Sequence, residues 1–346
     1  MLMGTLLGAF YILGVGMKIP RIVHTLTKEV RNNLTEYSHY LVAVSGGADS
    51  LALADICATL QREGFATFTV CHVEHGIRDK ESLEDMEFVE NFCVEKHLSY
   101  VGVHIDTLAY AEQNKLSIED AARQLRYGAL RKVMVDVGAS KILTAHQADD
   151  QAETVLWRFL RGAGLDGLAG MSLENNDVLR PLINVTREEI IDYLAEKKLN
   201  YRLDSTNANL KYTRNKIRQE LLPFLANNYN SRILETLSRT AKVLGEDALC
   251  LNELAQTEYQ KALIESGDAL VLDAKMLNFL APAICKRVLR IACFNLKLTE
   301  LDFERTQAIY EMLKRNTGNK VIELPQGVTV TLKNHRLIFV NKTIEQ

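Results

Sequence analysis

Apolar and polar positions along the first 200 residues form blocks that predict strands and helices in turn. Short apolar runs that end in glycine or polar residues predict strands at residues 41–44, 65–73, 99–105, 141–145 and 178–182. Between them, apolar residues recur at helical spacing and predict helices at 25–34, 51–60, 79–96 and 117–134. Strands that alternate with helices of this length are typical of a doubly wound, mainly parallel sheet. The N-terminal half is therefore predicted to be an α/β domain.

The pattern changes to mainly helical after about Thr186. Helices are predicted at 188–195, 210–225, 231–260, 274–295 and 300–315, with no further strand until the end of the chain. The last segment reads as strands joined at Gly327 and at Asn334-His335. We predict an apolar extension (1–17), a catalytic α/β domain (18–205) and a helical substrate domain with terminal strands (206–346).

Composition narrows the class of protein. The chain has 346 residues, enough for about two domains, and a net charge of −3, so a nucleic-acid surface would have to be local. Its six cysteines form no C-x-x-C pair and no zinc-like spacing. They are typical of reduced, mostly buried thiols in a cytoplasmic protein.

Residues 1–17 carry no charged side chain. A secretory signal would need a basic start and a cleavage site, and both are missing. We expect residues 1–16 to lie outside the functional fold, as a start site placed upstream of Met17 would explain. The alternative is a membrane anchor, although seventeen residues with four glycines is at the short limit for a membrane span.

The sequence S-G-G-A-D-S at 45–50 links the first predicted strand to a helix. Glycines between a strand and a helix N-terminus let a phosphate approach the backbone N–H groups. The sequence is neither the Walker loop nor G-x-G-x-x-G. The alternative is a tight structural turn.

A second group of polar residues follows the fourth predicted strand. His146 comes at the carboxyl end of that strand, and Asp149, Asp150 and Glu153 follow on the first turn of a helix. Asp150 and Glu153 are three positions apart and so share a helix face. Ordinary acids at a helix N-terminus, and a histidine that only ends a strand, are the alternatives.

Basic residues gather in two further places. Arg123 and Arg126 lie three positions apart in the predicted helix 117–134 and can project from one face. Residues 180–239 carry eleven Lys or Arg against seven Asp or Glu. Within that segment Tyr212, Arg214, Lys216 and Arg218 combine an aromatic ring with cations, a mixture suited to RNA. A solvated helix face is the alternative.

The order of these motifs resembles that of the tRNA(Ile)-lysidine synthetases, a branch of the N-type ATP pyrophosphatases. The resemblance spans residues 41–218 and rests on S-G-G-A-D-S, H-V-E-H-G-I-R, E-D-A-A-R-Q-L-R-Y, T-A-H-Q-A-D-D-Q-A-E-T, R-G-A-G-L-D-G-L-A-G-M, R-P-L, D-S-T-N and Y-T-R-N-K-I-R. The chain departs from the family at Gln147, where histidine is common, and at Leu203, where an acid is common. Its length resembles the shorter members, which lack a second C-terminal domain.

The resemblance implies a PP-loop domain of the adenine nucleotide α-hydrolase type. It also implies that ATP activates C2 of the wobble cytidine in a CAU anticodon and that free L-lysine then displaces AMP. The loop Ser45, Gly46, Gly47, Ala48, Asp49 and Ser50 would bind ATP, and Asp49 would hold Mg²⁺ through the phosphates. Arg123 or Arg126 would offset charge on the α-phosphate, His146 would orient the reactants, and Asp150 and Glu153 would bind lysine.

The same resemblance assigns tRNA contacts to Tyr212, Arg214, Lys216 and Arg218. It implies a cytoplasmic enzyme that needs no protein partner and no membrane, and it leaves a homodimer open. Two other functions stay open: a different PP-loop enzyme, such as a tRNA thiolase or an amide-forming ligase, and a nucleotide-binding module without catalysis. Thiolases of this kind generally need paired cysteines, and an amide ligase needs a source of ammonia.

Overall fold

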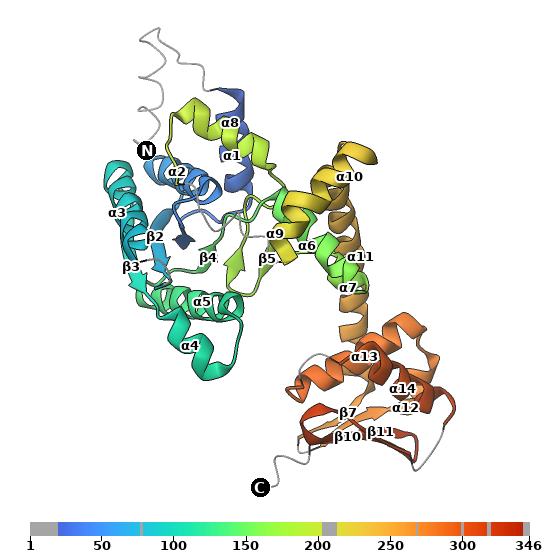
Figure 1. Ribbon diagram of the computed structural model, residues 1–346. Coiled ribbons are helices and arrows are strands. Elements are labelled where there is room, and N and C mark those ends of the chain that lie inside the picture. The colour runs from blue at the N-terminus through green and yellow to red at the C-terminus, as the bar shows by residue number, and fades with distance from the viewer. Residues whose placement is uncertain are drawn as a thin grey trace, which may run out of the picture. The chain divides into compact units, whose positions relative to one another are not determined.

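The computed structural model describes residues 20–76, 79–202, 213–267, 269–298, 301–316 and 320–341. The described chain forms two compact units that divide between Lys242 and Val243, within helix α11 (Ile233–Ala262). Each unit has its own sheet and its own hydrophobic core (Figure 1). The predicted boundary between 205 and 206 and the extension 1–17 lie outside the described residues.

The first unit is built on a six-stranded sheet of order β3-β2-β1-β4-β6-β5. All neighbouring strands are parallel except β5, which pairs antiparallel with β6 at one edge. The strands are β1 (His39–Ala43), β2 (Thr67–Glu74), β3 (Ser99–His104), β4 (Lys141–Leu143), β5 (Glu174–Asn175) and β6 (Val178–Leu179). The doubly wound, mainly parallel sheet predicted from the sequence is confirmed.

Helices cover both faces of this sheet, which is why its central strand is apolar on both sides. Leu41 and Val42 are fully buried and belong to two different hydrophobic clusters. Val42 packs in the cluster that includes α1, α2, α3 and α8, whereas Leu41 packs in the cluster built on α5 (Figure 1). The helices are α1 (Arg21–Asn32), α2 (Ala48–Arg62), α3 (Asp79–Lys96), α4 (Thr107–Asn114), α5 (Ile118–Asp136), α6 (Ala148–Leu160), α7 (Leu165–Leu168) and α8 (Arg187–Lys197).

The strand order places a switch point between β1 and β4. Strands β2 and β3 lie on one side of β1, and β4 and β6 lie on the other side. The connections that leave β1 and β4 therefore diverge at the carboxyl edge of the sheet, where open parallel sheets form their ligand sites. Residues 45–50 follow β1 and residues 144–153 follow β4, so the fold brings the two predicted motifs to the same edge.

A buried carboxylate ties three helices of this unit together. Asp55 of α2 is 1% exposed and accepts a hydrogen bond from the Tyr193 hydroxyl at 2.7 Å. Lys96 of α3 and Lys197 of α8 each place Nζ 3.2 Å from an Asp55 oxygen. Two cations and a hydroxyl thus compensate a charge that would otherwise be costly to bury.

Tyr193→Phe is expected to destabilise the protein without affecting its chemistry. The change removes a hydroxyl donor from the buried Asp55 carboxylate and leaves both lysines in place. A lost hydrogen bond to a charged group typically costs about 1.5–3 kcal/mol. Urea unfolding should report this as a lower midpoint. A midpoint equal to that of the exposed control Tyr229→Phe would contradict this role for Asp55.

The end of the first unit is helical. Helix α9 (Thr213–Lys216) continues through a π-helical turn, η2 (Ile217–Leu221), into α10 (Leu222–Asn228). Ile217 and Leu222 form a small core with Leu156 of α6. This core fixes the segment that carries Arg214, Lys216 and Arg218 against α6.

The second unit contains a five-stranded antiparallel sheet of order β7-β8-β11-β10-β9. Its strands are β7 (Leu263–Ser266), β8 (Ala269–Asp273), β9 (Val321–Glu323), β10 (Val328–Lys333) and β11 (Arg336–Asn341). Its other elements are α12 (Ala274–Phe279), α13 (Pro282–Asn295), α14 (Phe303–Lys314) and a 3₁₀ turn, η3 (Pro325–Gly327). The predicted terminal strands are confirmed, with turns at Gly327 and at Asn334-His335.

Three expectations for the secondary structure were wrong. Strands β7 and β8 precede the terminal strands, although no strand was expected there. The helix expected over 274–295 is interrupted because Pro282 starts a new helix, a position where its missing N–H costs nothing. Helix α4 was not predicted at all, although Asp106 caps it by accepting from the Ala109 N–H at 3.0 Å.

The cysteines and the hydropathy of the helices agree with the sequence. All six cysteines are unpaired, and five of them are buried. Among the described residues no helix is both long enough and apolar enough to cross a bilayer. Residues 1–17, for which a membrane anchor was the alternative, are not among them.

Candidate active site at the carboxyl edge of the sheet

The loop after β1 has the backbone that its glycines predict. Gly46 has a φ of +89°, a value that favours glycine, and Gly47 precedes the first residue of α2. The Ser45 N–H donates to Ser50 Oγ at 3.2 Å, and Ser50 Oγ donates to the Gly47 carbonyl at 2.9 Å. The two serines therefore brace the loop. The N–H groups of the first turn of α2 have no acceptor within the helix, which leaves them for an anion.

Arg202, which the sequence did not single out, fixes the other side of the loop. Its backbone N–H donates to the Gly46 carbonyl at 3.0 Å. Its guanidinium pairs with Asp85 at 2.7 Å and with Glu84 at 2.9 Å, both on α3. The loop is thus held between α3 and the segment after α8.

Asp49 lies in the first turn of α2 and faces Arg187 at the start of α8. Nη1 of Arg187 is 3.4 Å from both Asp49 carboxylate oxygens. Burial raises the pKa of Asp49 to about 6, Arg187 opposes the rise, and the negative charge of Asp150 adds to it. Asp49 is therefore close enough to α6 to sense the charge of that helix.

Asp149 joins the starts of α6 and α8. Its Oδ1 accepts from the backbone N–H of Arg187 at 3.3 Å. Burial raises the pKa of Asp149 also. The carboxylates of Asp49 and Asp149 thus share one arginine, which contacts them through its side chain and its backbone respectively. Sequence reasoning missed Arg187, although it follows the helix cap Thr186.

Helix α6 begins with a capping box in which Asp150 takes part. Oε1 of Gln147 accepts from the Asp149 N–H at 2.6 Å, and Oδ2 of Asp150 accepts from the Gln147 N–H at 3.1 Å. One oxygen of Asp150 therefore has the ordinary capping role that was the alternative to a functional one. The other oxygen, Oδ1, receives the Nη2 of Arg214 at 3.1 Å.

Glu153 lies one turn further along α6, not in the first turn as expected. It is 2% exposed and is 2.9 Å from Nε of Arg214 and 3.4 Å from Nε of Arg218. Burial raises the pKa of Glu153, and Arg214 opposes the rise. Asp150 and Glu153 thus form a carboxylate pair that holds a guanidinium. We call these two residues the acidic pair.

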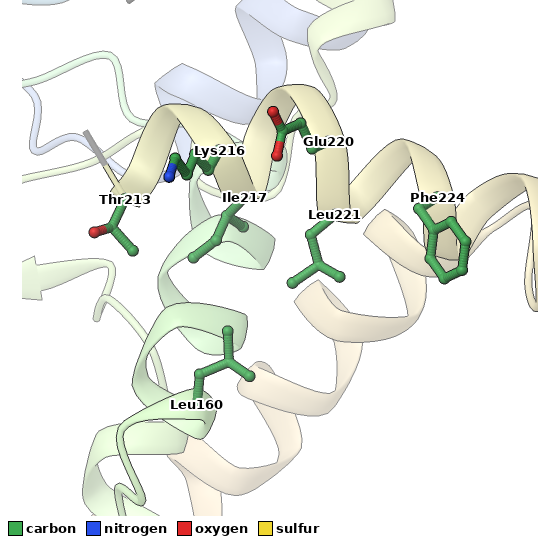
Figure 2. A pocket seen from close by; sticks show the side chains of 7 residues that line it. All are labelled: Leu160, Thr213, Lys216, Ile217, Glu220, Leu221 and Phe224. Carbon is green, nitrogen blue, oxygen red and sulfur yellow. The ribbon is translucent and has the colours of Figure 1, made fainter. Parts of the chain in front are cut away.

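The residues expected to bind tRNA fall in different surroundings. Arg214 and Arg218 turn toward the acidic pair. Lys216 lines an apolar hollow of about 480 Å³ between the end of α6 and the segment α9–α10. Figure 2 shows this hollow with Ile217 and Leu221 on one side and Leu160 on the other. Tyr212 lies outside the described residues.

His146 is kept neutral by its surroundings. Its Nδ1 is 2.9 Å from Oγ1 of Thr144. Burial lowers the pKa of His146 to about 4, Asp150 opposes this, and Arg180, Arg214 and Arg126 add to it. At neutral pH the ring is therefore a hydrogen-bonding group and not a cation. Asp150 of the acidic pair and Arg126 of α5 are thus both close enough for their charges to act on His146.

The predicted arginine pair of α5 gathers around one aromatic ring. The guanidinium carbons of Arg123, Arg126 and Arg131 lie 5.2, 5.5 and 5.8 Å from the centre of the Tyr127 ring. Burial lowers the pKa of Arg126, with the like charges of Arg123 and Arg214 in the same direction. Of the predicted pair, Arg126 is thus the member whose charge acts on His146 and on which the charge of Arg214 acts.

The residues around Asp49 suit magnesium held through phosphate. Within the described parts of the chain, no group of three or more His, Cys, Asp or Glu side chains could hold a metal alone. Mg²⁺ commonly takes one or two carboxylates together with phosphate oxygens and water. Asp49, next to the turn of Gly46 and Gly47, fits that pattern. In this structure Arg187 offsets the charge of the Asp49 carboxylate.

The chain is similar to a known domain family and to several named proteins. The family described as PP-loop domain matches residues 19–225. The chain is 32% identical over 331 residues to the tRNA(Ile)-lysidine synthase of Caldanaerobacter subterraneus subsp. tengcongensis, covering 95% of this chain and 70% of that protein. It is 33% identical to the synthase of Geobacter sulfurreducens, covering 94% and 71%, and 33% identical to that of Clostridium tetani, covering 86% and 64%. The chain thus spans about two thirds of the length of these relatives.

A solved structure supports the fold independently. The U34-tRNA thiolase NcsA from Methanococcus maripaludis, with its [4Fe-4S] cluster, aligns with a TM-score of 0.55 and 17% identity. The alignment covers 65% of this chain and 80% of the thiolase. At this identity the likeness concerns the fold alone.

Proposed function

The chain belongs to the tRNA(Ile)-lysidine synthases, ligases built on a PP-loop domain, and from this premise we propose that it joins free L-lysine to C2 of the wobble cytidine in the CAU anticodon of isoleucine tRNA. ATP and Mg²⁺ are the proposed co-substrate and cofactor. The observation that carries the proposal is the acidic pair, because a buried site that already holds a guanidinium suits the lysine ammonium.

In the first step the C2 oxygen of cytidine attacks the α-phosphorus of ATP and pyrophosphate leaves. The loop Ser45–Ser50 and the N-terminus of α2 hold the departing phosphates. Asp49 would hold Mg²⁺ together with phosphate oxygens, and the ion would offset their negative charge. Arg126, whose charge acts on His146, stabilises charge that develops on the α-phosphate. Neutral His146 orients the α-phosphate by hydrogen bonding.

In the second step the ε-amine of lysine attacks C2 and AMP leaves with the former C2 oxygen. The amine must first lose a proton, and a carboxylate with a raised pKa is a better acceptor than an ordinary one. Burial raises the pKa of Glu153 in this sense. Arg214 and Arg218 occupy the acidic pair before lysine does, so lysine must displace at least one of them.

The other PP-loop enzymes left open, a tRNA thiolase and an amide-forming ligase, would use a nucleophile other than lysine. A thiolase of this kind generally needs paired cysteines, but the sequence has no C-x-x-C pair and five of its six cysteines are buried. An amide ligase would use ammonia, which carries no side chain for the acidic pair to select. The discriminating experiment supplies ATP, Mg²⁺ and the tRNA with lysine, sulfide or ammonia in turn, and measures pyrophosphate and the modified base. Product with sulfide or ammonia, and none with lysine, would refute the proposal.

Arg214→Ala combined with Arg218→Ala is expected to weaken tRNA binding. Each lost phosphate contact should reduce the slope of log affinity against log salt by about 0.7 for single-stranded RNA. Affinity for ATP alone should change little, since both arginines pair with carboxylates of α6 and Arg218 acts on Asp49 only through its charge. Filter binding over a salt series measures this. An unchanged slope together with a lower KM for lysine would mean that both arginines only fill the acidic pair.

Cytoplasmic location, action without a protein partner and RNA contact by Tyr212 and Lys216 stay part of the proposal. Fractionation of cells that express the chain tests the cytoplasmic location. Activity of the purified chain alone tests whether a protein partner is needed. The open question of a homodimer is decided by the mass of the purified chain in solution.

A further inference from the structure

A polar cleft of about 470 Å³ lies between α5 and the turn that joins β5 to β6. Buried Tyr127 and Arg180 contribute to its lining, and exposed side chains from both elements form its rim. We call it the arginine cleft. Its lining includes three cations, two carboxylates and three amides around Tyr127: Arg123, Arg131 and Arg180, then Asp120 and Asp177, and then Gln124, Asn175 and Asn176.

Arg180 brings a buried positive charge to this cleft. The residue is 7% exposed, its Nη1 donates to the Ser172 carbonyl at 3.0 Å, and its Nε has no hydrogen-bond partner. Within the described chain, Arg180 forms no ion pair with a carboxylate. Burying a cation without a counter-charge is costly. Such a residue is therefore a candidate to meet an anion that comes from outside the chain.

Arg123 adds a second positive charge without a counter-charge. It lies over the Tyr127 ring and makes no ion pair with any described carboxylate. Its charge is close enough to act on Arg180, whose pKa is lowered by burial first and by Arg123 in addition. The neighbouring Arg131 differs, since its Nε pairs with Asp177 at 2.6 Å. Of the two carboxylates in the cleft, Asp177 pairs with Arg131, and Asp120 accepts from the Ser117 hydroxyl. Among the described residues Arg123 and Arg180 thus keep no carboxylate partner, which indicates an anion site.

The remaining lining suits a nucleotide better than a simple ion. The rim carries the amides of Gln124, Asn175 and Asn176, which both donate and accept hydrogen bonds as base edges do. The volume lies within the range of small-ligand sites. Arg180 directly follows Leu179, whose carbonyl accepts from the Thr144 N–H at 3.0 Å, and Oγ1 of Thr144 is 2.9 Å from Nδ1 of His146, so the cleft adjoins the segment that carries His146. A nucleotide in the cleft would therefore be a neighbour of the reacting one.

We propose that the arginine cleft binds one tRNA nucleotide that flanks the wobble cytidine, with its phosphate on Arg123 and Arg180. The rim amides then contact the base or ribose of that nucleotide. This inference rests on the proposed function, and it removes Arg123 from the ATP site, where the sequence allowed either Arg123 or Arg126. The cleft thereby holds the anticodon loop in register while the cytidine reacts.

The test pairs a neutral side chain with a neutral RNA linkage. Arg123→Gln keeps a helix-forming residue at an exposed position of α5, so the fold should be unaffected. Full-length tRNA is ligated from fragments that carry one methylphosphonate, a phosphate without charge, on either side of the wobble cytidine. Lys132→Gln, also exposed on α5 but outside the cleft, is the matched control.

Arg123→Gln should weaken binding of unmodified tRNA roughly three- to tenfold and reduce the salt slope by about 0.7. One of the two methylphosphonates should weaken binding to the wild-type protein by a similar factor. On that modified tRNA, Arg123→Gln should cause no further loss, because the two changes remove the same contact. Lys132→Gln should act independently of both linkages.

Losses that simply add at both linkages would overturn the proposal. So would a lower affinity for ATP with unchanged affinity for tRNA, which would return Arg123 to the ATP site. The proposed function is judged separately, by lysine incorporation in the wild-type protein. If Arg123→Gln and one methylphosphonate act on the same contact but no lysine is incorporated, the arginine cleft is supported and the lysine chemistry is refuted. If lysine is incorporated but the two changes act independently, the lysine chemistry is supported and the cleft is refuted.

Discussion

Asp49→Ala is expected to reduce ATP-dependent pyrophosphate release by at least about a thousandfold, equivalent to roughly 4 kcal/mol of transition-state stabilisation. Asp49 is the carboxylate that the structure places beside the loop, and the loop itself is braced by Ser45, Ser50 and Arg202. The variant should therefore keep its fold and lose its metal ligand. Steady-state pyrophosphate release with saturating tRNA measures the effect.

The exposed Asp136→Ala at the end of α5 is the control, because it removes the same charge far along the chain from the loop. It should release pyrophosphate at the wild-type rate. Release by Asp49→Ala at more than a tenth of that rate would show that Asp49 has only a structural role. Unfolding midpoints of both variants separate loss of chemistry from loss of fold.

The raised pKa of Asp49 predicts that the Mg²⁺ requirement of pyrophosphate release depends on pH. Burial raises the pKa of Asp49 to about 6, so the carboxyl group is increasingly protonated as the pH falls through that value. Protons then compete with Mg²⁺ for the same oxygens. The Mg²⁺ concentration for half-maximal release should rise below about pH 6 and stay constant above it. A requirement that does not change between pH 5 and 8 would contradict this.

Sequence reasoning was most successful where structure is local. The strand, glycine turn and helix around Gly46 follow from neighbouring residues, and the start of a helix at Ser117 does so too. The alternation of strands and helices also fixed the parallel sheet, because a right-handed crossover leaves few other arrangements. From that sheet it follows that residues 45–50 and His146 meet at one edge.

Residues that complete the site through long-range contacts were missed. Arg187 is 138 positions from Asp49, and Arg202 meets Gly46 across a similar gap. Arginines of this kind cannot be told from solvated ones until packing places them. Arg214 and Arg218 were predicted as tRNA contacts, but their ion pairs with the acidic pair could not be seen from the sequence for the same reason.

The error in the second unit has a different cause. The segment that forms β7 and β8 is short and follows a helix of 30 residues, so the helical pattern masked it. Gly267 between two short apolar runs was the available signal for a hairpin. Strand β8 is stabilised by pairing with β11, which comes more than sixty residues later and could not be inferred locally.

Glu153→Gln is expected to separate the two half-reactions, with adenylation retained and lysine use reduced. Adenylation needs ATP, Mg²⁺ and cytidine, and it makes no use of a lysine ammonium. The second step needs a counter-charge for that ammonium and an acceptor for its proton. Glutamine keeps the shape of Glu153 and can still accept from Arg214, but it supplies neither charge nor a base.

A charge-assisted hydrogen bond is worth about 1.5–3 kcal/mol, so lysine use should fall roughly ten- to a hundredfold. Adenylated tRNA should accumulate at low lysine, and the KM for lysine should rise. Asp150→Asn should act in the same direction, although its second oxygen also caps α6 and the variant will lose some stability. Labelled AMP on tRNA and lysine KM are measured in parallel.

The exposed Glu220→Gln in the neighbouring π-helical turn is the matched control, because it makes the same substitution outside the acidic pair. It should leave both half-reactions unchanged. If Glu153→Gln instead blocks adenylation and leaves the lysine KM unaltered, Glu153 belongs to the nucleotide or metal site. Arg214 and Arg218 would then serve to orient that carboxylate toward ATP, and the lysine site would have to lie elsewhere.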